Sequence, residues 1–260
     1  MSREEPLGGG NLNPAIARVD TNVHRTAGPW TPAVHELLGH LAAAAYPAPR
    51  VVGMDNSGRE VLTFIPGRCV EPDHMHLIDT DDAMRRVGAL IADYHLAQES
   101  FVVPPDAEWR EEGRDPTGSS EIVAHNDLAP WNLIVDDDDE WTFIDWDLAA
   151  PGRRMWDLAW ALHSFVGLWP HTTLTSEQIA SRIAAFSEGA RLRTEEVPDL
   201  LEVVIERTAD HAAMLRRRAV AGEENFVRMV AEGHADAWES GCSFVRSNRT
   251  IWLDHLADRT

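Results

Sequence analysis

The octet HNDLAPWN, residues 125–132, spaces a histidine, an aspartate and an asparagine as H-x-D-x-x-x-x-N. A carboxylate such as Asp127 can accept the proton of a hydroxyl group, and the amide oxygen of Asn132 is a hard ligand that suits Mg²⁺. Asp145 follows in the segment FIDWD and offers a second oxygen of that kind. Phosphoryl transfer needs a held acceptor oxygen, a proton acceptor and metal ions that bridge the phosphates, so this set is typical of a phosphotransferase.

Each part of the motif also has a simpler interpretation. A lone His125 is typical of a hydrogen-bonded core histidine, and Pro130 and Trp131 are predicted to serve the turn and the packing. The acidic run of residues 136–140 lacks the alternating spacing and the glycine of a calcium loop, so we expect a solvated hairpin tip. The ordered combination of the three polar residues is what favours the phosphotransferase interpretation.

The composition excludes several classes of partner. The chain has 260 residues and a formal charge of -20, from 43 acidic against 23 basic residues, and every basic residue is an arginine. Such a surface repels nucleic acid, so we expect no nucleic-acid partner. The apolar runs are too short for a membrane span, and no signal peptide is recognised, so a soluble cytoplasmic protein is expected. Cys69 and Cys242 have no metal-ligand spacing.

The first quarter of the chain is predicted to be a small sheet with one helix. Two short strands, AIARVD and NVHRT, flank a turn, and a helix follows from Thr31, the expected N-cap, with Pro32 at its first position. RVVGMD and REVLTFI then form a hairpin, before Pro66 and Gly67 break the pattern. The rest is predicted to be mostly helical, with helices at about 80–98, 153–168, 176–190, 197–219 and 222–256, and short strands near 121–127, 132–136 and 141–147.

The segments VAHNDLAPWNLIV and FIDWDLAAPGRRMWDLAWAL resemble the aminoglycoside phosphotransferase and choline kinase family, the small-molecule branch of the protein-kinase-like fold. The resemblance implies an α+β fold of two lobes, with a small β-rich N-lobe over residues 1–67 and a larger, mostly helical C-lobe over residues 68–260. It is specific between about residues 122 and 160, and weak in the N-lobe.

Carried over to this sequence, the resemblance makes Asp127 the catalytic base and His125 the residue that braces its loop. Asn132 and Asp145 would hold Mg²⁺ ions. Asp157 in the segment WDLA is expected to tie a helix start to the catalytic loop. Asp147 is either a further metal ligand or a solvated neighbour, and we favour the second interpretation.

The N-lobe departs from the kinase pattern, because this chain has no lysine to present to the nucleotide phosphates. The resemblance places Arg25 in that position, with Glu36 on the next helix as its partner and Arg18 as the rival candidate. Arginine keeps the charge and adds a forked donor for phosphate oxygens, but it is not interchangeable with lysine at a packed site.

Two further N-lobe segments complete the expected ATP site. The segment LGGGNLN would cover the phosphates with backbone N–H groups, although glycine runs near a terminus are also typical of linkers. LTFIPG is expected to form the hinge, with backbone groups near Phe64 and Ile65 facing the adenine.

The expected activity is ATP- and Mg²⁺-dependent transfer of a phosphoryl group to a hydroxyl of a small acceptor. An acidic C-lobe would suit a cationic acceptor such as an aminoglycoside or choline, and the candidate lining residues are Glu202, Glu206, Asp210, Glu223 and Asp236. Sugar, nucleoside, macrolide and amino-alcohol acceptors stay open. The alternative function is a kinase-like nucleotide-binding protein without transfer, which the missing lysine favours. A Ser/Thr protein kinase is disfavoured, because little room for an activation segment follows Asp145.

Overall fold

The N-terminal part of the protein is a five-stranded antiparallel sheet with one helix. The computed structural model describes residues 4–7 and 16–258. The sheet has the order β1-β2-β3-β5-β4, with β1 at Glu4–Pro6, β2 at Ile16–Val19, β3 at Asn22–Thr26, β4 at Val51–Met54 and β5 at Arg59–Thr63. Helix α1, Thr31–Ala43, connects β3 to β4. The predicted segment LGGGNLN lies, except for Leu7, outside the described residues.

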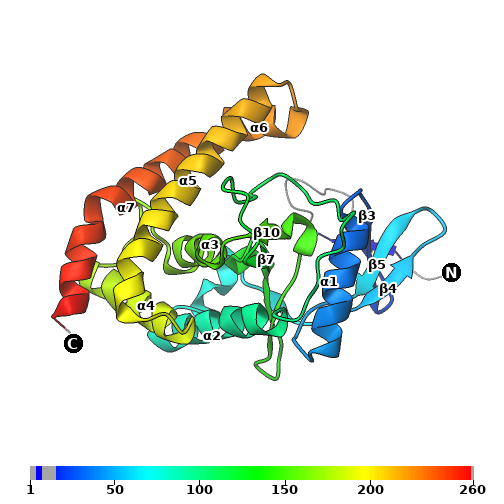
Figure 1. Ribbon diagram of the computed structural model, residues 1–260, viewed down its shortest axis with the longest axis horizontal. Helices are drawn as coiled ribbons and strands as arrows, with labels where there is room; N and C mark the ends of the chain where they lie inside the picture. The colour runs from blue at the N-terminus through cyan, green and yellow to red at the C-terminus, as the bar shows by residue number, and fades with distance from the viewer. Residues whose placement is uncertain (1–3, 8–15, 259–260) are drawn as a thin grey trace.

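The C-terminal part is mostly helical (Figure 1). Its helices are α2 at Asp81–Ala97, α3 at Arg154–Val166, α4 at Ser176–Gly189, α5 at Val197–Val220, α6 at Glu224–Ala231 and α7 at His234–Ala257. Two small antiparallel sheets accompany them, made of β6 (Arg68–Cys69), β8 (Leu133–Val135) and β9 (Trp141–Phe143), and of β7 (Ile122–Ala124) and β10 (Ala150–Gly152). Single 3₁₀ turns lie at Pro72–Leu77, Pro130–Asn132, Trp146–Leu148 and Thr194–Glu196. Figure 1 shows α5 and α7 side by side, with α6 projecting from the end of α5.

A long irregular segment joins α2 to β7. Residues 98–121 contain no helix or strand, and we call them the strap. Arg110 of the strap stacks on the Trp30 ring at the start of α1, 4.3 Å from its centroid. Glu112 forms an ion pair with Arg218 of α5 at 2.8 Å. The strap therefore contacts both the N-terminal helix and the long C-terminal helix pair.

One hydrophobic core runs through both parts. Leu37, Leu38 and Leu41 of α1 are fully buried in the same cluster as residues from α2, α3 and α4. Tyr46, just after α1, packs edge-on against Trp146, with the ring centroids 6.4 Å apart. Because burial of such side chains contributes about 1.5–3 kcal/mol each, α1 is fixed to the C-terminal part by apolar packing.

The structure confirms an α+β architecture with a β-rich N-terminal part and a helical C-terminal part. The predicted N-cap at Thr31 was wrong: Thr31 is the first helical residue, and its hydroxyl accepts a hydrogen bond from the Gly28 N–H at 2.9 Å. The single helix expected over 222–256 was also wrong. Gly233 has a φ of 85°, a left-handed conformation that ends α6 and starts α7.

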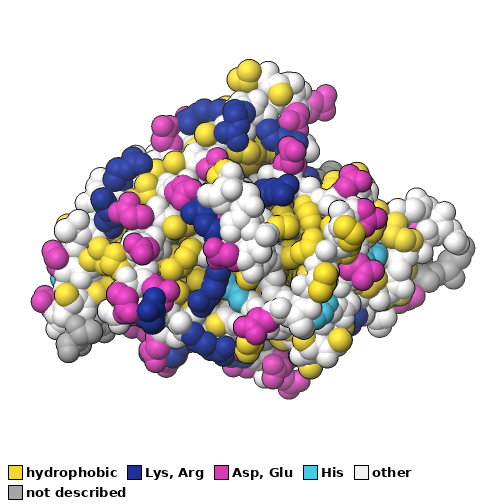
Figure 2. Space-filling model, in the orientation of Figure 1, with side chains coloured by type: hydrophobic (Ala, Val, Ile, Leu, Met, Phe, Trp, Pro, Cys, Tyr) yellow, Lys and Arg dark blue, Asp and Glu magenta, His cyan; other side chains and the backbone are white. Residues whose placement is uncertain are grey.

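We propose the boundary between the lobes at residues 67 and 68, because β6, which begins at Arg68, lies outside the first sheet and pairs with β8. No described helix is long and apolar enough to cross a membrane. Figure 2 shows arginine side chains lying among aspartates and glutamates over one face of the molecule. The acidic excess is therefore interrupted by local ion pairs rather than gathered in one field.

Candidate active site

The octet 125–132 forms a tight loop between β7 and β8. Asp127 and Asn132 meet in it: the Asn132 amide nitrogen donates to the backbone oxygen of Asp127 at 2.9 Å and to its carboxylate Oδ2 at 2.8 Å. Pro130 starts the 3₁₀ turn that returns the chain to β8 and is buried as expected. Trp131 lies in the same turn, as expected, and is 44% exposed, so its ring packs only in part.

The Asp127 carboxylate is surrounded by donors. Trp160 of α3 donates its indole N–H to Oδ1 at 3.0 Å, and Trp131 donates to Oδ2 at 3.4 Å. Burial and the charge of Asp145 raise the pKa of Asp127 to about 6, while the bonds from Trp131, Asn132 and Trp160 act in the opposite direction. The group is thus a stronger base than an ordinary aspartate and is still ionised at neutral pH.

His125 is fully buried behind the loop. Its Nε2 lies 3.1 Å from the Ile144 carbonyl oxygen, and its Nδ1 accepts the Asp127 N–H at 3.3 Å. Burial lowers the pKa of His125, so the neutral ring joins the loop to the strand that leads to Asp145. This geometry fits the predicted bracing role and gives the ring no open edge for chemistry.

Asp157 holds the loop from below. Its carboxylate accepts the N–H groups of His125 and Asn126 at 3.2 and 2.9 Å, and its Oδ2 lies 3.0 Å from the Nε2 of His95. The predicted tie between a helix start and the loop of residues 125–132 is therefore confirmed. Asn126 needs this support because its φ of 67° is left-handed.

Arg207 of α5 is a second brace, which the sequence did not predict. It is 2% exposed, donates to the Asn126 carbonyl oxygen at 2.8 Å and to that of Gly113, and lies over the Trp156 ring at 4.5 Å. Burial lowers its pKa to about 10. Nothing in the local sequence around Arg207 marks it, because its partners lie 81 and 94 positions away.

Asp145 lies on the loop after β9 in a left-handed conformation, with φ at 62°. Its Oδ1 accepts a hydrogen bond from the guanidinium of Arg25 on β3 at 2.8 Å. The candidate metal ligand Asp145 therefore contacts the candidate phosphate-binding residue Arg25. Among residues 4–7 and 16–258, neither Asp145 Oδ2 nor Asn132 Oδ1 has a hydrogen-bond partner. A carboxylate oxygen and an amide oxygen are each of the donor type that Mg²⁺ prefers.

Arg25 is buried and contacts three carboxylates. It pairs with Glu60 on the neighbouring strand β5, with Asp145, and with Asp147 at 2.6 Å. Burial disfavours its charge, but Asp147, Glu60 and Asp145 outweigh that cost and raise its pKa. The interpretation of Asp147 as a solvated neighbour was wrong, because it is 5% exposed and ion-paired.

The predicted pair of Arg25 with Glu36 was wrong. Glu36 is exposed on the outer surface of α1, whereas Glu60 lies directly opposite Arg25 in the β3–β5 register. Helix α1 reaches the pair through His35 instead, whose Nε2 lies 2.8 Å from Glu60. A turn of 100° per residue separates His35 from Glu36, so only one of them can face the sheet.

Arg18 and the hinge segment lie on the same face of the sheet as Arg25. Arg18 stacks on the Phe64 ring, 4.0 Å from its centroid, and its guanidinium donates to the Asp20 carbonyl oxygen rather than to Asp145. The geometry thus favours Arg25 over Arg18 as the phosphate-binding candidate. The Phe64 N–H donates to the Thr21 carbonyl oxygen at 2.8 Å, so this one N–H group is already used, and the hinge contacts near Phe64 and Ile65 stay a prediction.

The acidic residues expected to line an acceptor site are mostly neutralised. Four of the five form ion pairs with arginine: Glu202 with Arg249 at 2.6 Å, Glu206 with Arg153 at 3.0 Å, Glu223 with Arg218 at 2.6 Å and Asp236 with Arg216 at 2.7 Å. Local arginines therefore balance four of the five carboxylates, and the acidic acceptor site stays a prediction.

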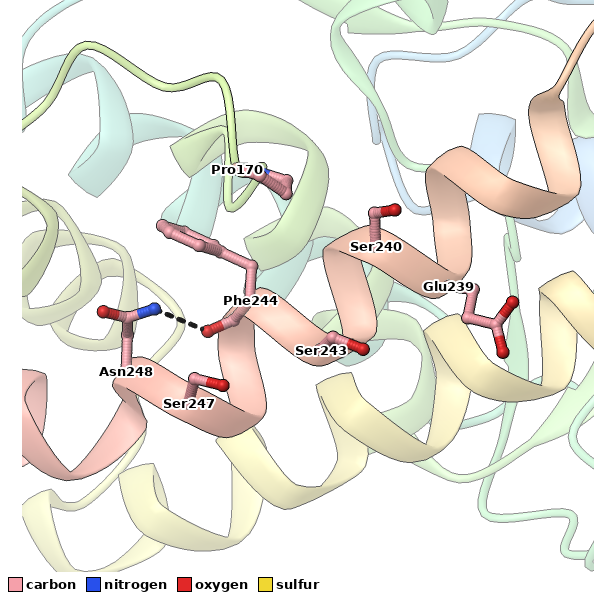
Figure 3. A pocket seen from close by; sticks show the side chains of 7 residues that line it. All are labelled: Pro170, Glu239, Ser240, Ser243, Phe244, Ser247 and Asn248. Carbon is pink, nitrogen blue, oxygen red and sulfur yellow. Dashed lines mark hydrogen bonds between the residues drawn. The ribbon is translucent and has the colours of Figure 1, made fainter.

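The hollow drawn in Figure 3 lies away from this site. It has a volume of about 550 Å³ and runs along α7, where Ser240, Ser243 and Ser247 share one face. The Asn248 amide donates to the Phe244 carbonyl oxygen at 2.8 Å beside it. Its wall contains none of the candidate catalytic residues.

The fold and the site together define a kinase-like phosphotransferase class. Residues 105–197 match the profile of the phosphotransferase enzyme family. The trifolitoxin immunity protein of Rhizobium leguminosarum bv. trifolii is 33% identical over 206 residues, which cover 78% of this chain and 74% of that protein. The chain belongs to the phosphotransferase enzyme family.

Solved structures share the fold at low sequence identity. Amicoumacin kinase hAmiN, in complex with AMP-PNP, Ca²⁺ and Ami, has a TM-score of 0.65 and 13% identity, with 83% of this chain and 81% of that chain covered. Plasmodium vivax ethanolamine kinase has a TM-score of 0.60 and 12% identity, with 95% of this chain and 83% of that chain covered. The GDP complex of aminoglycoside 2'-phosphotransferase-IIIa has a TM-score of 0.58 and 14% identity, with 96% of this chain and 93% of that chain covered.

Proposed function

We propose that this protein transfers the terminal phosphoryl group of a nucleoside triphosphate, with ATP as the first candidate, to a hydroxyl group of a small molecule. The observation that carries the proposal is the meeting of four groups. Asp127 is bonded to Asn132 and lies near Asp145, and Asp145 is bonded to Arg25 of the N-terminal sheet. A proton acceptor, two metal-type oxygens and a cation for phosphate are thereby held together.

In the proposed reaction Asp127 accepts the proton of the acceptor hydroxyl. The acceptor oxygen forms a bond to the γ-phosphorus, and the bond between that phosphorus and the bridging oxygen breaks, so that its electron pair leaves with the nucleoside diphosphate. Asp127 then returns the proton to solvent. A divalent cation, when bound, would neutralise charge on the phosphates, and Asn132 and Asp145 are the residues that would hold it.

Arg25 is the proposed phosphate contact and Ile65 the proposed hinge contact of the nucleotide. Glu60 and Asp147 hold the guanidinium from two sides, so its fork is oriented before a nucleotide binds. Structures with the same fold contain AMP-PNP in one case and GDP in another. Both ATP and GTP are therefore donors to test.

The acceptor is proposed only as a hydroxyl compound. An aminoglycoside is one candidate, by analogy with the structural relative, but the arginine pairs of Glu202, Glu206 and Asp236 remove most of the charge that would attract it. The 33% identity to an immunity protein favours a second candidate role, protection of the cell from a toxin that carries a hydroxyl group. Either acceptor is consistent with a cytoplasmic location, which we also propose.

The test is a screen of hydroxyl compounds, toxins included, with Mg²⁺ and ATP or GTP, read by a mass gain of one phosphate. Asp127→Asn should reduce product formation by about 1000-fold or more, because the proton acceptor is lost. Its nucleotide affinity should stay within about twofold, since Asp127 contacts no phosphate in the proposed reaction. Equal turnover in wild type and variant would rule the base assignment out. Asp137→Asn, at a 95% exposed side chain in the hairpin tip, is the matched control.

The alternative is a nucleotide-binding protein without transfer activity. Its specific support is that Arg25, the proposed substitute for the kinase lysine, is already paired with three carboxylates. Thermal melts with and without Mg²⁺ and nucleotide separate binding from its absence. Asp145→Asn should abolish the Mg²⁺-dependent part of the shift. Clear binding with no product from any acceptor would favour this alternative.

A further inference from the structure

Trp160 holds the candidate base from the side opposite Asn132. Its indole nitrogen, on α3, lies 3.0 Å from Asp127 Oδ1, and the side chain is 4% exposed. The ring stacks on Trp238 of α7, with centroids 4.4 Å apart and planes at 20°, and packs against His211 of α5 at 4.8 Å. Three helices therefore fix the position of this one N–H group.

The two carboxylate oxygens of Asp127 accept different numbers of hydrogen bonds. Oδ2 accepts hydrogen bonds from Asn132 at 2.8 Å and from Trp131 at 3.4 Å, which uses both of its lone pairs. Oδ1 accepts only the Trp160 bond among the residues the structure describes. One lone pair of Oδ1 is thus left for a further donor.

We propose that Trp160 is a positioning residue, and that its N–H aims Oδ1 of Asp127 at the acceptor hydroxyl. This inference rests on the proposed transfer function. In the reaction the hydroxyl proton moves to the open lone pair of Oδ1, while the acceptor oxygen bonds to the γ-phosphorus and the diphosphate leaves with the electron pair of the broken bond. Trp160 exchanges no atom or electron with the substrate.

The bond should matter most in the chemical step. An indole held by Trp238 and His211 cannot follow a rotating carboxylate, so the Asp127 side chain keeps one orientation. Without the N–H, the carboxylate is free to turn about its Cβ–Cγ bond, and fewer bound acceptors meet the open lone pair. The effect should appear in kcat rather than in KM.

The first arm of the test is kinetic. Trp160→Phe keeps the stacked ring and removes only the donor, and we expect kcat to fall about 10- to 100-fold, as for loss of one charge-assisted hydrogen bond. KM for nucleotide and acceptor should stay within about twofold. The matched control is Trp141→Phe, since Trp141 is also buried and its indole donates to Asp139 at the same 3.0 Å, in the β8–β9 hairpin. A kcat equal to that of the control would overturn the positioning role.

The second arm does not depend on turnover. In a ¹H–¹⁵N spectrum of the tryptophan indoles, the resonance that Trp160→Phe removes should move upfield in Asp127→Asn, because a charged acceptor is replaced by a neutral one. The Trp141 resonance should not move. An unmoved Trp160 resonance would overturn the inference even in an active enzyme. A moved resonance in a protein without any product would leave the contact standing and refute the transfer function instead.

Discussion

At the scale of single residues, the site depends on buried polar groups whose charges are fixed by their neighbours. Asp127 has a raised pKa and stays ionised at neutral pH, while His125 behind it is neutral. Burial also controls the charge of His163, which is not one of the candidate site residues. It is fully buried between Trp169 and Trp238, at ring distances of 4.4 and 5.2 Å, and neither ring nitrogen has a hydrogen-bond partner among the described residues.

His163 should make the protein less stable in mild acid. Burial lowers its pKa to about 3, below the value of about 6.5 in the unfolded chain. Below pH 6.5 the unfolded state therefore binds a proton that the folded state does not, and stability falls as the pH drops from 6.5 towards 3. At pH 5 the loss from this group is about 2 kcal/mol.

Urea unfolding at pH 7 and pH 5 checks this expectation. His163→Phe keeps an aromatic ring in the cluster, and it should reduce the difference between the two free energies of unfolding by about 2 kcal/mol. The control is His171→Gln, at an exposed position. An unchanged pH difference in His163→Phe would mean that His163 is already charged, or already bonded, in the folded protein.

At the scale of elements, the phosphate-binding candidate is held by strand pairing. Arg25 and Glu60 face each other across β3 and β5, while helix α1 contributes only His35. This differs from the expected arrangement, in which the helix supplies Glu36. The ion pair is therefore part of the sheet register, and a shift of α1 would not separate its partners.

Glu60→Gln should destabilise the protein by about 3 kcal/mol or more, because it leaves the buried Arg25 charge with one fewer carboxylate and breaks the contact to His35. Glu36→Gln should change the free energy of unfolding by less than about 0.5 kcal/mol, since its side chain is exposed. Denaturant unfolding of the two variants measures both values. Equal losses in the two variants would contradict the strand pairing.

The sequence predicted the parts of the site that are local. The spacing of His125, Asp127 and Asn132 lies within one loop, and the periodicity of α2 and α5 lies within one helix, so short stretches contain the whole signal. Glu60 and Arg25 are 35 residues apart with a helix between them. Their pairing depends on which strands become neighbours in the sheet, and the sequence of a single strand does not determine its neighbours.

Trp160 and Arg207 escaped prediction for the same reason. Apolar helix positions such as Trp160 indicate a core, and the structure confirms the burial, but the indole N–H that reaches Asp127 depends on how α3 meets the loop. Arg207 is an arginine in an amphipathic helix and gives no sign of being buried. Distances between elements decide such roles, and local patterns do not report them.

At the scale of the whole molecule, a large negative charge coexists with many local ion pairs. The formal charge is -20, and arginines are interspersed with acidic side chains on the visible face (Figure 2). Exposed pairs of this kind contribute little each, typically below about 1 kcal/mol. The uncompensated acidic residues repel one another, and this repulsion opposes the compact state.

Moderate salt should therefore stabilise the protein. Raising sodium chloride from about 20 mM to about 500 mM shortens the Debye length from roughly 20 Å to roughly 4 Å, so the net repulsion is screened while buried pairs such as Arg25 with Glu60 are affected less. We expect Tm to rise by a few degrees, measured by differential scanning calorimetry. Sucrose, which adds no ionic screening, is the comparison solute. A falling Tm would mean that the surface pairs outweigh the excess charge.

The strand-borne pair of Arg25 and Glu60 has a consequence for control of the protein in the cell. An ion pair that is part of a sheet register forms as soon as the chain has folded, and it does not depend on the position of a helix. Output would then be set by how much protein is made and how much acceptor arrives, rather than by a signal received at the enzyme. Such a design suits the protective role proposed above, because the site would be ready before a harmful compound enters.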